Sequence, residues 1–244
     1  MMEENRKNEI LNKAKKFFRE VIAVNHIKNT KKLTNISEFK INPFLLFYKA
    51  NFFSGDNSYT SLAKALVYPR VLGSSIDTSF GQNIQKFCST VLEGFGSAIP
   101  GIDIEFDDQV DGRHKYCQLK AGPNTINKDD ISTIVGHFQS TINQARANHL
   151  HLSIDDLIVG VLYGTEYQLS NHYKTIMQHY PVIVGQEFWY RLTGDNNFYL
   201  DLIDVFSEVA QEADGVELLE NVISNLATEL EELFESQMIT HEDE

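Results

Sequence analysis

The spacing of apolar residues along the chain predicts alternating helices and strands. Apolar side chains recur at helical intervals over residues 5–28. Nearly uninterrupted apolar runs at 156–164 (DLIVGVLYG) and 181–185 (PVIVG) are typical of strands buried on both faces. Pro43 is expected to break regular structure. Further helices are expected at 59–69, 81–92, 127–149, 186–192, 198–213 and 216–236. This order predicts an α/β fold with a mixed central sheet and helices on both sides.

Residues 101–122, GIDIEFDDQVDGRHKYCQLKAG, have the pattern of an antiparallel hairpin. Two alternating apolar and polar runs flank an Asp-Gly pair at 111–112, which strongly favours a two-residue turn. With that turn, Asp103 is expected opposite Lys120, and Glu105 opposite Gln118. Because strand side chains alternate, all four are expected on one face, with the apolar residues on the other.

Two carboxylates, an amide and a lysine on one face suit metal-dependent hydrolysis of a phosphodiester. Carboxylate and amide oxygens are ligands that Mg²⁺ prefers, and such an ion polarises phosphate and activates a bound water. A lysine there orients that water, deprotonates it or neutralises developing charge. A structural Asp–Lys pair across the strands explains the same pattern, and spacing alone leaves both interpretations open. The following stretch, AGPNTINKDD, opens a helix whose first N–H groups can hold a phosphate.

Asp103, followed 15 residues later by Gln118-x-Lys120, resembles the PD-(D/E)xK nuclease motif, with PGID at 100–103 as its lead-in. Over residues 40–215 the chain is similar to type II restriction endonucleases of the PD-(D/E)xK superfamily that cut interrupted GC-rich palindromes of the GGNCC type. The segments that support this resemblance are INPF (41–44), PRVLG (69–73), DTSFG (77–81), QLKAG (118–122), VGVLYG (159–164), GQEFWYRLTGD (185–195) and EVAQEAD (208–214).

The resemblance implies a restriction-endonuclease-like core and a homodimeric, Mg²⁺-dependent enzyme that cuts both strands of duplex DNA. It also implies a cognate DNA methyltransferase in the same system. Carried over, Asp103 is the principal metal ligand, Lys120 is the motif lysine, and Gln118 takes the place of the second acidic residue. Gln118 is neutral, so from the expected register we infer that Glu105 supplies the missing carboxylate. The backbone carbonyl of Leu119 is a further expected ligand.

Four residues after the hairpin are candidates for DNA contact, and the alternative interpretation is that they form a helix cap and a loop. They are Asn124, Thr125, Asn127 and Lys128. Reading guanine in the major groove usually needs Arg or Lys. The available ones are Arg70, Arg113, Lys115 and Arg191, among which the sequence does not choose. Two other functions stay open: a repair or structure-specific nuclease of the same fold, and a catalytically weak DNA-binding protein on that fold.

The charge is unevenly distributed. The net charge of −13 argues against a protein that coats nucleic acid indiscriminately, yet residues 1–50 contain 11 Lys or Arg against 5 Asp or Glu. One domain over 1–244 is expected, with a basic helical arm (1–40), a nuclease core (41–215) and an acidic C-terminal helix and tail (216–244). Leucines at heptad-like spacing in that last helix suit either a dimer contact or packing within its own domain.

From its hydropathy, its N-terminal residues and its cysteines, the protein is expected to be cytoplasmic. The chain has no apolar run long enough to span a membrane, and its first residues lack the apolar segment of a secretion signal. Its two cysteines form neither a disulfide framework nor a zinc-binding pattern. No membrane partner is expected.

Overall fold

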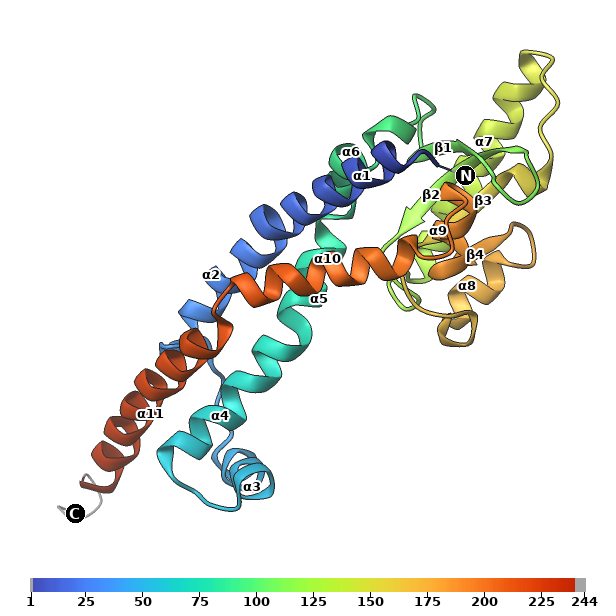
Figure 1. Cartoon of the computed structure of the whole chain (residues 1–244). Helices are drawn as coiled ribbons and strands as arrows, with labels where there is room; N and C mark the ends of the chain where they lie inside the picture. The colour runs from blue at the N-terminus through green and yellow to red at the C-terminus, as the bar shows by residue number, and fades with distance from the viewer. Residues whose placement is uncertain (1, 240–244) are drawn as a thin grey trace. The chain divides into compact units, whose positions relative to one another are not determined.

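The computed structural model describes residues 2–239, which pack as two compact units built from segments distant in sequence (Figure 1). Unit 1 contains the chain up to Phe18 together with Phe80–Ser207, and unit 2 contains Arg19–Ser79 and the chain from Glu208 onward. The expected acidic tail at 240–244 lies outside the described residues. The single domain over 1–244 stays a prediction. Within residues 2–239, no helix is both long and apolar enough to cross a membrane.

Unit 1 contains a four-stranded mixed sheet in the order β1-β2-β3-β4. The strands are β1 (Ile104–Asp107), β2 (His114–Lys120), β3 (Leu157–Val161) and β4 (Val182–Val184). β1 and β2 are antiparallel, whereas β2, β3 and β4 run parallel. The helices of this unit are α1 (Glu4–Phe17), α6 (Ile84–Val91), α7 (Lys128–Ala147), α8 (Asn171–Ile176), α9 (Gln186–Thr193) and the first part of α10 (Phe198–Glu212). The expected α/β architecture is confirmed.

Helices cover both faces of the sheet. On one face, Ile134 and Phe138 of α7 belong to the same buried cluster as Val159 and Val161 of β3. On the other face, the ring of Phe188 from α9 leaves no room for a side chain at Gly160. Burial on both sides explains why β3 is a nearly continuous apolar run rather than an alternating one.

The hairpin differs in register from the expected one. Glu105 pairs with Tyr116, not with Gln118, so the predicted pairing is shifted by two residues. The prediction that Asp103 lies opposite Lys120 is wrong for the same reason. A shift of two residues preserves the strand alternation, so Glu105, Gln118 and Lys120 still share a face.

A buried carboxylate sets this register. The N–H of Asp108 donates to the carbonyl of Arg113, which leaves four residues in the loop where the Asp-Gly pair predicted two. The Asp108 side chain is almost fully buried and accepts hydrogen bonds from the Val110 N–H and from Arg191 of α9, each at 2.8 Å. A buried charge needs such partners, so this tertiary contact outweighs the local turn preference.

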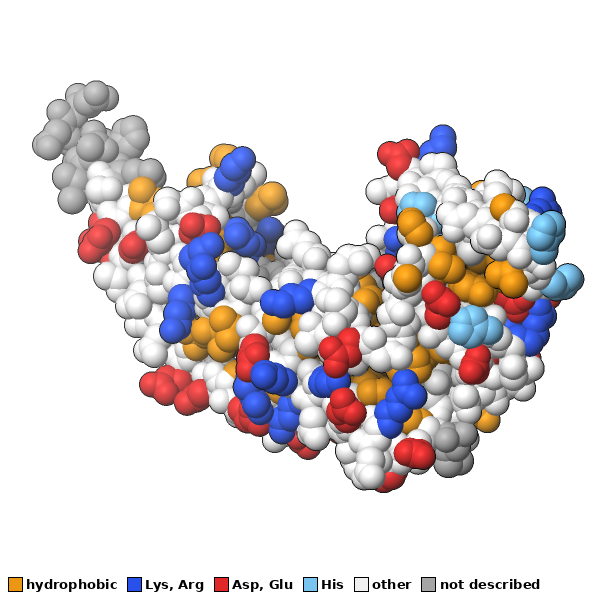
Figure 2. All heavy atoms as spheres, turned by 90° about the horizontal axis from the view of Figure 1, so that it is seen from above, with side chains coloured by type: hydrophobic (Ala, Val, Ile, Leu, Met, Phe, Trp, Pro, Cys, Tyr) orange, Lys and Arg blue, Asp and Glu red, His pale blue; other side chains and the backbone are white. Residues whose placement is uncertain are grey.

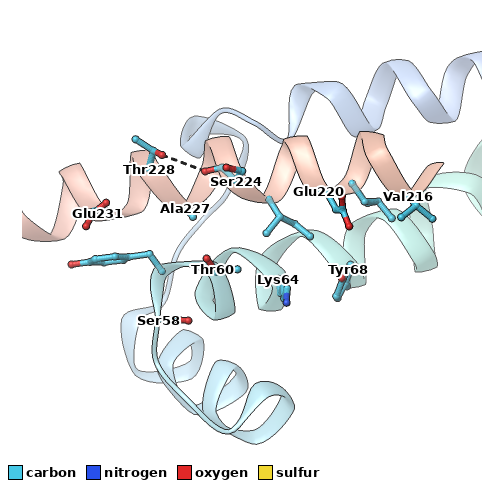
Figure 3. A pocket seen from close by; sticks show the side chains of 13 residues that line it. Ser58, Thr60, Lys64, Tyr68, Val216, Glu220, Ser224, Ala227, Thr228 and Glu231 are labelled. Atoms are coloured by element: carbon cyan, nitrogen blue, oxygen red, sulfur yellow. Dashed lines mark hydrogen bonds between the residues drawn. The ribbon is translucent and has the colours of Figure 1, made fainter. Parts of the chain in front are cut away.

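Unit 2 is helical. Its helices are α2 (Val24–Lys32), α3 (Pro43–Ser54), α4 (Tyr59–Pro69) and α11 (Gly215–Ile239), and the chain passes between the units within η1 (Phe18–Ala23), α5 (Ile76–Gln82) and α10. Val222, Leu226 and Leu230 of α11 are buried in this unit's own core. The heptad-like face therefore packs within the chain. A groove of about 880 Å³ between α4 and α11 has an apolar floor and a charged rim that includes Lys64 and Glu220 (Figure 3).

Two helical segments depart from expectation. Pro43 does not break a helix but begins α3, where its missing N–H costs nothing and Asn42 caps the end by accepting from the Leu45 N–H. Residues 76–80, which precede the helix expected at 81–92, belong to α5. For α3, the sequence did not separate a helix start from a loop, because Asn and Pro are common in both.

We expect the buried Lys115 to be structural. It is 2% exposed, and its Nζ donates to Asp111 at 2.7 Å and to the Asp155 carbonyl at 3.0 Å. Replacing Lys115 with Met leaves these acceptors without a cation and should lower the free energy of unfolding by about 3 kcal/mol. Urea unfolding followed by the fluorescence of Trp189, the single tryptophan, measures this in unit 1.

The matched control is Lys40→Met, because Lys40 is exposed. That substitution should change the free energy of unfolding by no more than about 0.5 kcal/mol. Equal stability of Lys115→Met and the wild type would show that the ammonium group of Lys115 does not contribute to stability and that its side chain acts only by packing.

Candidate functional site

The Asp103 carboxylate lies where β1 separates from β2. Ile104 pairs with Cys117. The N–H of the preceding residue, Asp103, also donates to the Cys117 carbonyl, at 2.9 Å. Two residues against one is the arrangement of a β-bulge, which redirects a side chain. The Asp103 carboxylate accordingly accepts the Leu119 N–H at 2.6 Å, in a position where a ladder bond would otherwise lie. Its other oxygen accepts from Gln85 of α6 at 3.3 Å.

The turn before Asp103 is held against α7. Gly101 has a φ of +83°, which favours glycine. A Cβ at this position would lie 2.4 Å from the ring of His137, so no larger residue fits without displacing one of the two. This contact fixes the approach of the chain to Asp103.

Gln118 is nearly buried and is tied to α7. Its Nε2 donates to the Ile134 carbonyl at 3.3 Å. Because a carbonyl only accepts, the amide nitrogen must face α7 and the amide oxygen occupies the other branch. A glutamate in the same rotamer would place an oxygen against that carbonyl. The neutral residue in the motif position is therefore explained by its neighbour.

Lys120 and the Leu119 backbone complete this end of the hairpin. In a strand, the N–H and C=O of one residue point to the same side, so the Leu119 carbonyl points toward the same edge of β2 as its N–H. Lys120 is half-buried at the end of β2, and no acceptor pairs with its Nζ within the described part of the chain. Its ammonium group is thus available to a ligand.

Glu105 is occupied by other partners. One carboxylate oxygen accepts from the Ser97 hydroxyl, and the other lies 3.1 Å from Nε2 of His114. Asp107, on the same face, lies 2.8 Å from Nδ1 of the same imidazole. The structure does not bring Glu105 to Gln118, which was the reason for expecting it to replace the missing carboxylate.

The loop after the hairpin is braced by hydrogen bonds. The carbonyl of Gly122 accepts from the Tyr173 hydroxyl at 2.9 Å and from the Thr125 hydroxyl at 2.8 Å. Burial raises the pKa of Tyr173 to about 12, so this hydroxyl stays a donor at neutral pH. A Cβ at Gly122 would lie 2.3 Å from Tyr163. Thr125 is therefore an internal brace.

Asn127 caps α7. Its Oδ1 accepts from the N–H groups of Asp129 and Asp130, and the Asp130 carboxylate accepts from the Asn127 N–H. These groups were expected to be free to hold a phosphate, and the capping box uses two of them. Asn124 and Lys128 are exposed on either side of the cap.

Many basic side chains of unit 1 are engaged in ion pairs. Lys7 lies 2.6 Å from both Asp195 and Asp201, and hydrogen bonds to these two carboxylates raise its pKa well above the ordinary value. Arg191 and Arg113, expected as candidates for reading guanine, pair with Asp108 and Asp156. On the face drawn in Figure 2, blue and red side chains are intermixed. Of the basic residues at 1–50, Lys7, Lys13 and Arg19 are engaged in ion pairs in this way.

Four neighbours of the site were not among the residues predicted from the sequence: Gln85, Ser97, His114 and His137. The strand alternation does place His114 on the face of Glu105, so that residue was accessible from the pattern. The other three reach the site from separate segments, and no local pattern marks them.

We expect Gly101→Ala to loosen the Asp103 carboxylate. The positive φ and the His137 ring make alanine strained by about 1–3 kcal/mol. That strain should speed hydrogen exchange of the Leu119 amide, which donates to Asp103. Gly136→Ala in α7 is the control, since a Cβ there meets nothing within 4 Å. Unchanged exchange in Gly101→Ala would contradict the strain argument.

His114 should titrate above its ordinary pKa. Partial burial lowers the pKa of the imidazole, but hydrogen bonds to Asp107 and Glu105 outweigh it and raise the pKa. The resulting stabilisation is complete below the unfolded pKa of about 6.5 and is lost as pH rises through the raised folded value. NMR titration should show a lower His114 pKa in Asp107→Asn than in the wild type. An identical pKa would rule out that pairing.

A family model described as type II restriction endonuclease EcoO109I matches residues 7–214. A search of curated proteins finds no match to the chain. The matched segment contains the whole hairpin and nearly all of unit 1. Because the match spans most of its length, the chain belongs to the type II restriction endonuclease EcoO109I family and is an enzyme of that class.

Proposed function

We propose that the protein is a Mg²⁺-dependent endonuclease that cuts both strands of duplex DNA at a short palindromic, GC-rich site. The observation that carries this proposal is the Asp103 carboxylate fixed beside the Leu119 backbone, directly before Lys120. A GGNCC-type site, action as a homodimer and a cognate DNA methyltransferase in the same system follow from the resemblance and belong to the same proposal.

The donor atoms at the hairpin end fit a magnesium ion. They are the Asp103 carboxylate, the Leu119 carbonyl and the Gln118 amide oxygen, all hard oxygen ligands. Mg²⁺ typically takes one or two carboxylates and completes its shell with water and substrate phosphate. When bound, the ion supplies polarisation of the phosphate and activation of a water. No cluster of three or more His, Cys, Asp or Glu suited to a metal occurs in the described residues, consistent with a carboxylate-poor site.

Lys120 acts on the scissile phosphate in this proposal. Its Nζ has no acceptor within the described chain, so the charge is available to orient a water or to neutralise charge developing on phosphorus. Asp111, Asp108 and the other carboxylates at the far end of the hairpin already have cationic partners. Within the described residues, these carboxylates are therefore not partners of Lys120.

Glu105 is the second carboxylate in this proposal, because of the strand face on which it lies. It shares a face with Gln118 and Lys120, and its partners are neutral Ser97 and the titratable His114. Leaving His114 to bind a metal costs one partly exposed hydrogen bond. The contribution of Glu105 is tested by a variant of its own.

Contacts to DNA are assigned to the loop before α7 and to the first residue of that helix. Exposed Asn124 and Lys128 are proposed to touch the phosphate backbone directly. Thr125 and Asn127 contribute by positioning, because their side chains are bonded within the loop and the cap. Phosphate contacts of this kind fix the register on the duplex and carry no sequence information.

The test is digestion of unmethylated phage DNA by purified protein with Mg²⁺. Wild type should give discrete fragments. Lys120→Ala and Asp103→Asn should each lower the cleavage rate by at least about 10²-fold. The first removes the cation that acts on the phosphate, and the second removes the negatively charged ligand of the metal. Glu105→Gln should do the same if it binds the metal.

Asp107→Asn is the matched control for Glu105→Gln. Both carboxylates bond His114, but Asp107 lies one further position along the face from Asp103. If Glu105→Gln and Asp107→Asn cut DNA equally fast, Glu105 is not a metal ligand. The assignment of the protein as a nuclease is unaffected by that result. Nicking of branched or damaged DNA without discrete fragments would replace the restriction function by a repair function.

A further inference from the structure

The carboxyl ends of the three parallel strands lie at the same edge of the sheet as Lys120. Lys120 is the last residue of β2 and pairs with Val161, the last residue of β3. The Leu162 N–H then donates to the Lys120 carbonyl at 3.0 Å. In open α/β sheets, ligands bind beyond the carboxyl ends of the strands. The segment 162–170 therefore leaves the sheet next to the candidate site.

This segment is fastened to the loop that follows β2. The Ser170 N–H donates to the Pro123 carbonyl at 3.0 Å. The ring of Tyr163 lies so close to Gly122 that a Cβ there would be 2.3 Å from it. Gly164 has a φ of +103°, and a Cβ on it would lie 2.9 Å from Pro123. The two segments are thus fixed relative to each other.

Between these contacts the chain forms a closed turn that contains η6 (Glu166–Gln168). Oε1 of Gln168 accepts from the Thr165 N–H at 2.9 Å, and the Gln168 N–H donates to the Thr165 carbonyl at 3.0 Å. Leu169, the next residue, is buried in the core of unit 1. The turn at 165–168 is therefore held both internally and by the core beneath it.

The turn presents one aromatic side chain to solvent. Tyr167, at the middle of η6, is 98% exposed. A single exposed aromatic residue is common on protein surfaces and needs no explanation by itself. This one stands on a braced turn at the edge of the sheet where Lys120 lies. Because the backbone is already ordered, a ligand that contacts the ring meets a low ordering cost.

We propose that the turn at 165–168 contacts DNA and that Tyr167 packs into a groove of the duplex next to the phosphate to be cut. This inference rests on the proposed function, because the place of the turn has this meaning only if Lys120 acts on a DNA phosphate. The loop before α7 and the turn at 165–168 then contact one duplex from neighbouring strand ends.

The charges of the two segments favour different parts of the DNA. Residues 162–170, LYGTEYQLS, contain one Glu and neither Lys nor Arg, so they do not attract phosphate. A neutral aromatic ring instead gains from packing on bases, and a carboxylate such as that of Glu166 accepts from the amino group of cytosine. A protein partner is disfavoured, because one ring covers far less than the roughly 800 Å² that a specific interface buries on each side.

The test is the affinity of the full-length protein for a duplex that contains the site mapped by wild-type digestion, with Ca²⁺ replacing Mg²⁺ to slow cleavage. Tyr167→Ala should raise the dissociation constant about 10-fold, the effect of losing one aromatic contact to a base. Tyr167→Phe should bind within about 2-fold of wild type, because the ring makes the contact. The matched control is Leu150→Ala, since Leu150 is 63% exposed and lies on the amino-terminal side of β3. It should leave the dissociation constant unchanged.

Salt dependence separates a groove contact from a phosphate contact. Tyr167→Ala removes no charge, so the slope of log Kd against log salt should equal that of wild type. Lys128→Ala should reduce the slope by about 1. A reduced slope in Tyr167→Ala would place the turn on the phosphate backbone and overturn the groove contact.

Cross-linking measures the contact directly. Tyr167→Cys should form a disulfide with a duplex that carries a thiol tethered to a base beside the cut, in either the major or the minor groove. The native Cys88 and Cys117 are buried and give no background. Leu150→Cys should not cross-link under the same conditions. Failure of Tyr167→Cys with both duplexes overturns the proposal.

Cleavage by the same samples distinguishes this proposal from the proposed function. If wild type gives discrete fragments and Tyr167→Ala binds and cuts equally well, the turn is not a DNA contact and the nuclease stands. A wild type that neither binds nor cuts duplex DNA overturns both. A Tyr167→Ala variant with unchanged DNA affinity but a lower sedimentation coefficient assigns Tyr167 to a protein interface and overturns the DNA contact.

Discussion

The hydrogen bond from the Leu119 N–H to the Asp103 carboxylate is the contact on which the site depends. At 2.6 Å it takes the place of a ladder bond at the point where β1 leaves β2. A charged acceptor makes this bond stronger than a neutral one, so it both ends the hairpin and fixes a negative charge there. The turn behind it is held by the close approach of Gly101 to His137. A shift of that turn therefore moves the carboxylate.

The remaining charges are arranged so that they do not compete with this one. At the far end of the hairpin, Asp108 and Asp111 are neutralised by Arg191 and Lys115. Gln118 adds no charge and is bonded to the α7 backbone. Lys120 alone among these groups has no acceptor within the described chain. The consequence is one carboxylate fixed against the backbone of Leu119 and, on the next residue, one ammonium group without an acceptor in the described chain.

The two units use burial differently. Unit 1 covers a sheet with helices on both faces, so its apolar runs are internal and its polar residues gather at strand ends. Unit 2 buries one face of α11 and one face of α3. The aromatic side chains of Phe44, Tyr48 and Phe52 on α3 are exposed. An exposed apolar surface of this kind promotes aggregation, so its presence indicates that it serves an interaction.

The sequence by itself determined the α/β class, the buried strands and the shared face of Glu105, Gln118 and Lys120. It did so because alternation with a period of two is a property of the backbone, and a shift of two residues leaves the faces unchanged. The register itself was decided by tertiary structure, since the buried Asp108 needs Arg191 from α9. The position of Asp103 likewise depends on His137 and Gln85, which lie on separate helices. A local sequence pattern predicts the secondary structure of a segment and which side chains share a face. The position of a buried charge depends instead on the distant segment that supplies its partner.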